Sequence, residues 1–137
     1  MEYKLINDAD RAFFKAEYNE ASKVLYTFWF GKTISIEEVK GGGMMMVEIA
    51  RERSVKKIMN HNDNLLASWD SSLPWVSKVW VPAMEKAGVL KMAHLISTNL
   101  FAQISAENTR KIVEHRASAF DFRIFSEKEE AMFWLME

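Results

Sequence analysis

The side chains best placed for chemistry lie in one short polar segment, Asn-His-Asn-Asp-Asn at residues 60–64. It follows a predicted strand at residues 55–60, and open α/β sheets usually bind ligands beyond the carboxyl ends of their strands. The same residue types also fill ordinary turns, because Asn and Asp side chains bond to their own backbone. Both interpretations stay open. The side chains that could contact a ligand or partner are Asn60, His61, Asp63 and Asn64.

Metal and catalytic chemistry find little support. His61 and Asp63 supply at most half of a metal site, since the other two histidines, His94 and His115, are isolated in the sequence. The chain has no Cys, hence no thiolate ligand and no Cys nucleophile. No Gly-x-Ser-x-Gly segment occurs. We therefore expect no metal, no cofactor and no enzymatic activity.

Three Trp side chains crowd the following stretch, at positions 69, 75 and 80. Trp75 and Trp80 are five residues apart, so they cannot both lie on one stripe of an α-helix, and we expect one ring to be partly exposed. An exposed Trp is typical of a protein contact, although amphipathic rings at the rim of a domain are equally common. We include Trp69 and Trp75 in the candidate ligand or partner loop.

Three glycines and three methionines follow one another at residues 41–46. A phosphate-binding loop would need a strand before them and a Lys-Ser or Lys-Thr pair after the last Gly, whereas here they lie within a predicted helix. Each Gly costs a helix about 1 kcal/mol relative to Ala. We therefore expect the glycines to allow close backbone packing or to be merely tolerated, and the Met side chains to fill core space.

Hydrophobic patterns and capping signals predict one α/β domain over residues 1–137. Strands at residues 3–6, 12–18 and 24–30 should form an antiparallel meander. Helices and strands then alternate: a helix from a capping box at Ser35 to about residue 53, strand 55–60, helix 73–87 kinked or broken at Pro82, strand 89–96, helix 106–116 capped by Ser105, strand 120–124, and a last helix opened by a capping box at Ser126. Strands joined by helices normally lie parallel, so the predicted sheet is mixed.

Composition limits the partners and the compartment. The 137 residues carry 18 Lys and Arg against 19 Asp and Glu, a net charge of -1, which provides no field to attract nucleic acid. No apolar run approaches the roughly 20 residues that span a bilayer, and the first residues lack the layout of a signal peptide. We expect a cytoplasmic protein that neither binds nucleic acid nor inserts into a membrane.

The triplet Asp70, Ser71 and Ser72 gives the chain a resemblance to the STAS-like family of anti-sigma-factor antagonists. In that family a strand runs into an Asp-Ser-Ser-Gly turn at the start of a helix, and a Ser there is phosphorylated; here Leu73 replaces the Gly. The resemblance to small bacterial STAS-like proteins of unknown function is closer and spans nearly the whole chain. It implies a STAS-like fold and a regulatory or binding role. The segments that carry it are residues 80–82, Gly88, residues 101–105 and residues 130–135.

Ser71 and Ser72 leave two interpretations open. The resemblance implies that one of them is a phosphorylation switch. The local chemistry instead favours a helix N-cap, because Leu73 and Pro74 follow. A Pro fits the first helical turn, where its missing N–H would be unpaired anyway.

Two functions follow as hypotheses. The first is a regulatory protein-interaction domain whose contact face includes residues 63–75. The alternative is a domain that binds a small molecule or lipid in a pocket at the carboxyl ends of the parallel strands. Because 49% of the residues are hydrophobic, with nine Phe and five Trp, we also expect surplus apolar surface and a homodimer.

Overall fold

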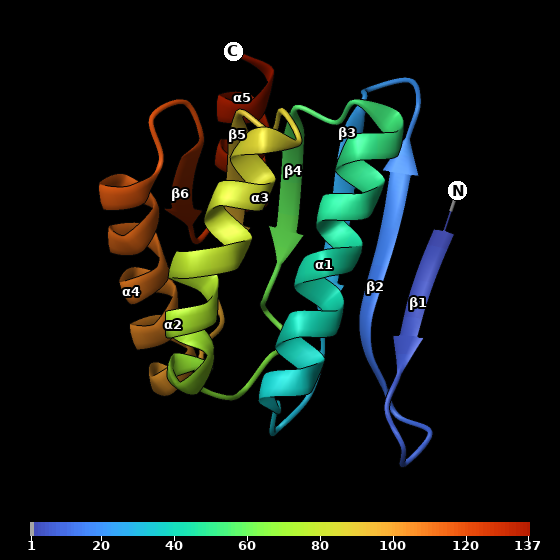
Figure 1. Ribbon diagram of the computed structural model, residues 1–137, viewed down its shortest axis with the longest axis vertical. Helices are drawn as coiled ribbons and strands as arrows, with labels where there is room; N and C mark the ends of the chain where they lie inside the picture. The colour runs from blue at the N-terminus through green and yellow to red at the C-terminus, as the bar shows by residue number, and fades with distance from the viewer. Residues whose placement is uncertain (1) are drawn as a thin grey trace.

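The first three strands form an antiparallel meander at one side of a six-stranded sheet, as seen in the computed structural model, which describes residues 2–137 (Figure 1). β1 (Glu2–Ile6) pairs with β2 (Ala12–Asn19), and β2 pairs with β3 (Val24–Trp29). No residue of β3 is fully exposed on either face of the sheet. This two-sided cover explains its nearly unbroken apolar and aromatic sequence.

From β3 onward the sheet is parallel. β4 (Lys57–His61), β5 (Lys91–Leu95) and β6 (Asp121–Phe125) follow in the order in which they occur in the chain. Each connection therefore steps one strand in the same direction, and right-handed crossovers place the connecting helices on one face. α1 (Ile36–Arg53) joins β3 to β4, and α4 (Leu100–Arg116) joins β5 to β6. The predicted fold class, one α/β domain with a mixed sheet, is confirmed.

The connection between β4 and β5 contains a helical segment in four short pieces. In the chain they are the 3-10 turn η1 (Asp70–Ser72), α2 (Leu73–Trp75), the π-helical turn η2 (Val76–Trp80) and α3 (Val81–Lys86). At the π turn the N–H of Val81 bonds to the carbonyl of Val76, five residues back. The next residue, Pro82, has no N–H with which to continue α-helical pairing. The predicted kink or break at Pro82 thus takes the form of a π turn just before the proline, while the helical residues continue without a gap from Asp70 to Lys86.

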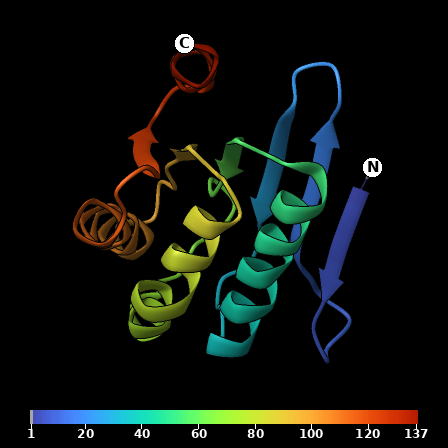
Figure 2. The ribbon, with the colours of Figure 1, turned by 45° about the horizontal axis from the view of Figure 1, so that its top comes forward.

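The opposite face of the sheet is covered by α5 (Lys128–Met136), which Figure 2 shows apart from the layer of the other helices. Its apolar side packs on β3, β4 and β5, where the residues in contact are Ala131, Trp134 and Leu135 against Val24, Met59 and Ala93. The Lys91 ammonium also donates to the carbonyl of Trp134 at 2.9 Å. The parallel part of the sheet is therefore covered on both faces.

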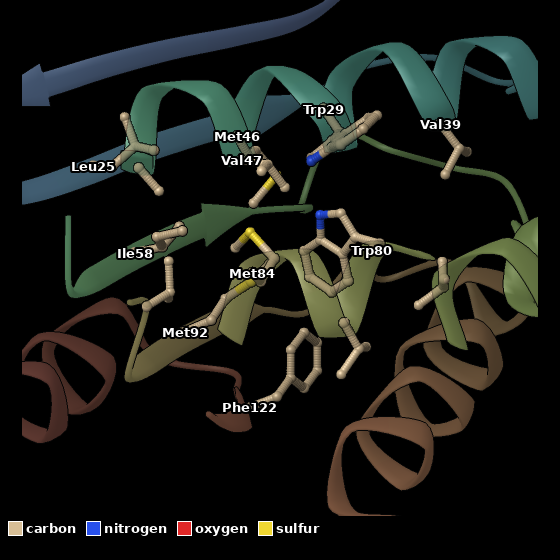
Figure 3. Close-up of a cluster of buried hydrophobic side chains, with 14 of the residues drawn as sticks. Leu25, Trp29, Val39, Met46, Val47, Ile58, Trp80, Met84, Met92 and Phe122 are labelled. Carbon is tan, nitrogen blue, oxygen red and sulfur yellow. The ribbon is translucent and has the colours of Figure 1, made fainter. Parts of the chain in front are cut away.

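The main core lies between the sheet and helices α1 and α3 (Figure 3). Leu25, Ile58 and Met92 rise from neighbouring strands, and Met46 and Met84 meet them from the two helices. All five side chains are at most 3% exposed. The prediction that the Met cluster fills core space is confirmed for Met46.

The predicted capping box opens α1. Ser35 Oγ accepts the N–H of Glu38 at 3.1 Å, and Glu38 Oε1 accepts the N–H of Ser35 at 2.8 Å. These two bonds satisfy backbone donors that have no partner within the helix.

The caps predicted at Ser105 and Ser126 are wrong. α4 begins at Leu100, and Asn99 rather than Ser105 caps it by accepting the N–H of Ala102 at 3.1 Å. Asn caps a helix as well as Ser does, so the helix is capped by Asn99, which comes before Ser105 in the chain. α5 follows Glu127, whose side chain makes no capping bond, and Ser126 lies outside that cap position.

Candidate ligand cavity

A cavity of about 70 Å³ lies between the sheet and the helices on its α1 side, at the carboxyl half of the parallel strands. Trp29, Asn60, His94 and Phe122 line it from β3, β4, β5 and β6. The other walls come from the α1 region (Ile34, Val39, Gly43 and Met46), the loop after β4 (Asn62, Leu65 and Trp69), the helical segment (Trp75, Val76 and Trp80), Met92 and Thr109. The cavity thus lies under the helices, not beyond the strand ends.

One wall of the cavity is fully hydrogen-bonded. Asn60, 3% exposed, accepts at Oδ1 from Thr27 Oγ1 at 2.6 Å and from Trp29 Nε1 at 3.0 Å. An indole N–H can only donate, so the atom that receives it must be the amide oxygen of Asn60. The amide nitrogen of Asn60 is therefore the atom 3.0 Å from His94 Nδ1, and it must donate there.

This chain of bonds determines which His94 nitrogen carries the proton. Burial lowers the pKa of His94 to about 3, so the ring is neutral near pH 7. Since Nδ1 accepts from Asn60, the single ring proton lies on Nε2. His94 is thus a hydrogen-bond donor toward the remaining direction, at Nε2.

Two N–H groups at this cavity have no acceptor within residues 2–137: His94 Nε2 and Trp80 Nε1. Their side chains are 2% and 5% exposed. Buried polar groups are normally paired, and an unpaired one costs about 1–3 kcal/mol. By contrast, Nε1 of Trp69, in the same cavity lining, donates to Thr109 Oγ1 at 2.9 Å.

The π turn brings Trp75 and Trp80 to the same cavity. We expected that α-helical spacing would keep them apart, and this expectation is wrong because a π turn bonds residues five apart and so aligns them. Trp80 is buried and Trp75 is partly exposed, as expected for one of the two rings. Val79, which α-helical spacing would bury beside Val76, is 43% exposed instead.

Gly43 allows α1 to approach these two rings. A Cβ on Gly43 would lie 2.9 Å from Cη2 of Trp75 and 3.1 Å from Cδ1 of Trp80. Cδ1 is bonded to Nε1, so the edge of Trp80 that carries the unpaired N–H faces α1, as Figure 3 also shows. The predicted close packing of the glycines is thus confirmed at this position.

The two neighbouring glycines differ in their surroundings. A Cβ on Gly42 would overlap the six-membered ring of Trp29, which confirms close packing there as well. A Cβ on Gly41 would make only ordinary contacts, at 3.8 Å. Gly41 is therefore tolerated rather than required.

The mouth of the cavity is marked by Ile34 and Trp75. Among the described residues that line the cavity, these two are partly exposed and the others are buried. Ile34 and Trp75 are therefore the lining residues that solvent partly reaches.

The structure brings together only some of the residues proposed as a ligand or partner loop. Asn60, Trp69 and Trp75 line the cavity. Asp63 and Asn64 are exposed in the loop after β4, where the carbonyl of Asn64 accepts the N–H of Gly31 at 3.2 Å. This part of the loop lies outside the cavity lining because it extends the pairing of β3 with β4.

His61 faces the other side of the sheet, since successive residues of a strand alternate in direction. Its ring stacks on Phe28 with 4.5 Å between centroids, and its Nδ1 lies 3.8 Å from Asp63 Oδ1. Burial lowers the pKa of His61, although Asp63 acts in the opposite sense and Lys128 adds to the lowering. His61 and Asp63 are thus neighbours, but they do not belong to the cavity.

The two candidate serines differ in exposure. Ser72 is buried and stands at the N-cap position of α2, but it makes no side-chain capping bond, so a cap at Ser72 is wrong. The nearby hydroxyl that bonds to a free amide is that of Ser68, which accepts the N–H of Asp70 at 3.1 Å. Ser71 is exposed.

Sequence reasoning missed His94 and Trp80 as members of the site. His94 was expected to be isolated, and it is indeed far in sequence from its partner Asn60. The available signal was its position inside an apolar, buried strand, because a polar ring there needs partners.

No metal site, no membrane-spanning helix and no significant similarity to known proteins was found in residues 2–137. Within residues 2–137 no three His, Asp or Glu side chains are grouped so that they could hold a metal ion. In the same part of the chain, no helix combines the length and apolar character required to cross a bilayer. No protein-family model matches the sequence, and searches of curated proteins and of solved structures gave no significant match.

Proposed function

We propose that this domain binds a small molecule in the cavity between the sheet and helices α1 and η2. The observation that carries the proposal is the pair of buried N–H donors, Trp80 Nε1 and His94 Nε2, that find no acceptor within residues 2–137. Both belong to side chains that line the same cavity. A ligand with hydrogen-bond acceptors would remove an energetic cost of about 1–3 kcal/mol for each donor.

The site is suited to binding rather than catalysis. An indole N–H is not a nucleophile, and His94 already accepts a hydrogen bond at Nδ1. With a pKa of about 3, caused by burial, His94 does not take up a proton near neutral pH and is a poor general base. Binding is therefore the role that these two groups support.

A cavity-filling variant tests this function. Val76→Phe places a larger side chain at a buried cavity position, whereas Val79→Phe changes an exposed position in the same π turn. Protein purified from its native host is examined by native mass spectrometry, and its melting temperature is measured against a panel of metabolites and lipids. We expect a bound mass or a melting shift for wild type and Val79→Phe, and its loss in Val76→Phe. A ligand-free mass with no melting shift in any of the three proteins would contradict the proposal.

A second function, contact with a regulatory protein, is supported by an apolar surface on α4. We call it the α4 patch: Leu100, Phe101 and Ile104, which are 64%, 65% and 46% exposed. The adjoining Ser105 hydroxyl donates to Asp70 Oδ1 at 2.8 Å, so the patch borders the loop proposed as a contact face. A parallel sheet in chain order with its crossover helices on one face is also compatible with the STAS-like resemblance. A cytoplasmic regulatory domain is the setting that this resemblance implies.

The α4 patch can be compared with an exposed aromatic residue elsewhere. Phe101→Glu should abolish capture of a partner from host extract, while Phe133→Glu, at a 75% exposed position on α5, should not. Exposed apolar patches commonly mark interaction sites. Equal capture by wild type and Phe101→Glu would rule out this surface.

The homodimer stays a prediction, and the same two variants test it. The expected result by light scattering is a dimer for wild type and Phe133→Glu, and a monomer for Phe101→Glu. A wild-type monomer at tens of micromolar would contradict it.

We assign the proposed phosphorylation to Ser71. Ser71 is exposed whereas Ser72 is 3% exposed, and a kinase needs access to the hydroxyl. The test is recovery from host cells of a peptide covering residues 68–78. Phosphate on Ser72 alone would contradict this assignment.

A further inference from the structure

The unpaired groups at the cavity are both donors, and this restricts the ligand. Trp80 Nε1 can only donate, and the bond from Asn60 to His94 Nδ1 leaves His94 with its proton on Nε2. A ligand that offered only donors would leave both N–H groups unpaired. A cation would meet the positive ends of both N–H dipoles, which opposes the attraction that aromatic rings exert on cations.

The cavity provides no countercharge for an anion. Among the described lining residues there is no Lys, Arg, Asp or Glu, and His94 is neutral near pH 7. Bringing an unpaired carboxylate into such a site costs several kcal/mol. The acceptor on the ligand should therefore be neutral.

The remaining lining favours an apolar ligand body. Trp29, Trp69, Trp75 and Phe122 present aromatic rings, and Met46 on α1 adds an adaptable thioether. Resting on the proposed small-molecule binding, we infer that the ligand class is a neutral molecule with an apolar body and a carbonyl-type oxygen that accepts from the Trp80 or the His94 N–H group.

Three small probes of similar shape test separately whether the ligand needs a carbonyl oxygen and whether it must be neutral. Acetophenone carries a neutral carbonyl, cumene replaces the carbonyl with a hydrocarbon branch, and benzoate carries a negative charge. Binding is followed on the full chain by two-dimensional NMR. The five Trp residues give five indole N–H signals, and Trp80→Phe identifies the one that belongs to Trp80.

The expected result is binding in the order acetophenone, cumene, benzoate, with acetophenone about tenfold tighter than cumene, the equivalent of about 1.4 kcal/mol. Acetophenone should move the indole proton of Trp80 downfield, as new hydrogen bonds do, and cumene should not. A long-range nitrogen spectrum should show the proton of His94 on Nε2.

A matched pair of variants isolates the Trp80 N–H. Trp80→Phe and Trp69→Phe both replace an indole by a smaller ring in the cavity lining, but Trp69 already donates to Thr109. The preference for acetophenone over cumene should fall toward equality in Trp80→Phe and persist in Trp69→Phe. An unchanged preference in Trp80→Phe would overturn the role assigned to its N–H.

Failure of the inference and failure of the proposed function give different results. Equal binding of cumene and acetophenone, tighter binding of benzoate, or a His94 proton on Nδ1 would overturn the ligand class and leave binding in place. Binding of none of the probes at millimolar concentration, with no movement of the Trp80 signal, would overturn the inference. A ligand-free mass and no melting shift against the wider panel would in addition remove the proposed function.

Discussion

The two walls of the cavity carry similar polar side chains in opposite states. On the wall from β3 and β4, Asn60 accepts from Trp29 and also from Thr27, a buried β3 residue outside the cavity lining. On the wall from η2 and β5, Trp80 and His94 each keep an N–H with no acceptor within residues 2–137. Folding thus pairs one wall and leaves the other open. The paired wall stabilises the fold and orients His94, and the open wall is the part that we propose serves a ligand.

The largest expected change in stability comes from lowering the pH, which acts through His94 on the open wall. His94 has a pKa of about 3 in the folded protein because of burial, against an ordinary value of 6.5. Because the folded pKa is lowered, the full stabilisation is present above about pH 6.5 and is lost as the pH falls toward 3. The loss should reach about 4–5 kcal/mol, at about 1.4 kcal/mol per pKa unit.

Urea denaturation at a series of pH values measures this loss. His94→Gln should flatten the curve between about pH 6.5 and 3. His115→Gln, at an exposed position, is the matched control variant. Parallel curves for wild type and His94→Gln would show that the His94 proton does not govern the acid response.

Removing the centre of the paired wall should have the next largest effect. Asn60→Leu leaves the Thr27 hydroxyl, the Trp29 N–H and His94 Nδ1 without their partner, and it should cost about 3–4 kcal/mol of unfolding free energy. Asn64→Leu, in the exposed loop, should cost about 0.5 kcal/mol or less. Chemical denaturation of both variants gives the comparison. Similar stabilities would mean that the paired wall does not stabilise the fold.

Ala substitutions at the three glycines of α1 compare how tightly the helix packs against each wall of the cavity. Gly42→Ala would overlap Trp29 of the paired wall and should destabilise by about 2 kcal/mol. Gly43→Ala presses less severely on Trp75 and Trp80, and the gain in helix propensity should limit its cost to about 1 kcal/mol. Gly41→Ala should stabilise by up to about 1 kcal/mol. Thermal melts of the three variants should follow this order, and a destabilising Gly41→Ala would contradict it.

The smallest expected effect is the difference in stability between replacing a paired indole, Trp69, and replacing an unpaired one, Trp80. Without ligand, Trp69→Phe loses ring packing and the bond to Thr109, whereas Trp80→Phe loses ring packing but also removes an unpaired buried N–H. Trp69→Phe should therefore be less stable than Trp80→Phe by at least about 1 kcal/mol. The free energies of unfolding in urea provide the measurement. The reverse order would indicate that the Trp80 N–H has a partner in solution.

The sequence predicted the order of elements well because apolar periodicity and turns are local signals. The α1 capping box and the departure from α-helical pairing next to Pro82 followed from local chemistry. Caps at Ser105 and Ser126 failed because neighbouring residues compete for the same role: Asn99 caps α4 and leaves Ser105 inside it.

The site was predicted only in part because its hydrogen bonds connect distant residues. Asn60 was named from its place at a strand end, but its partner is set by the parallel register that puts Asn60 opposite His94. No pattern in either strand indicates that register. Trp80 was missed because the π turn changes which residues of the helical segment share a side.

The strand order of the sheet also bears on how the chain acquires its structure during synthesis. Neighbours in the sheet follow one another in the chain, so each strand can pair with one that has already been made. α5 departs from this scheme, since it covers Val24, Met59 and Ala93 on strands made before it. Until α5 emerges from the ribosome, that apolar face is open to chaperones and to other nascent chains.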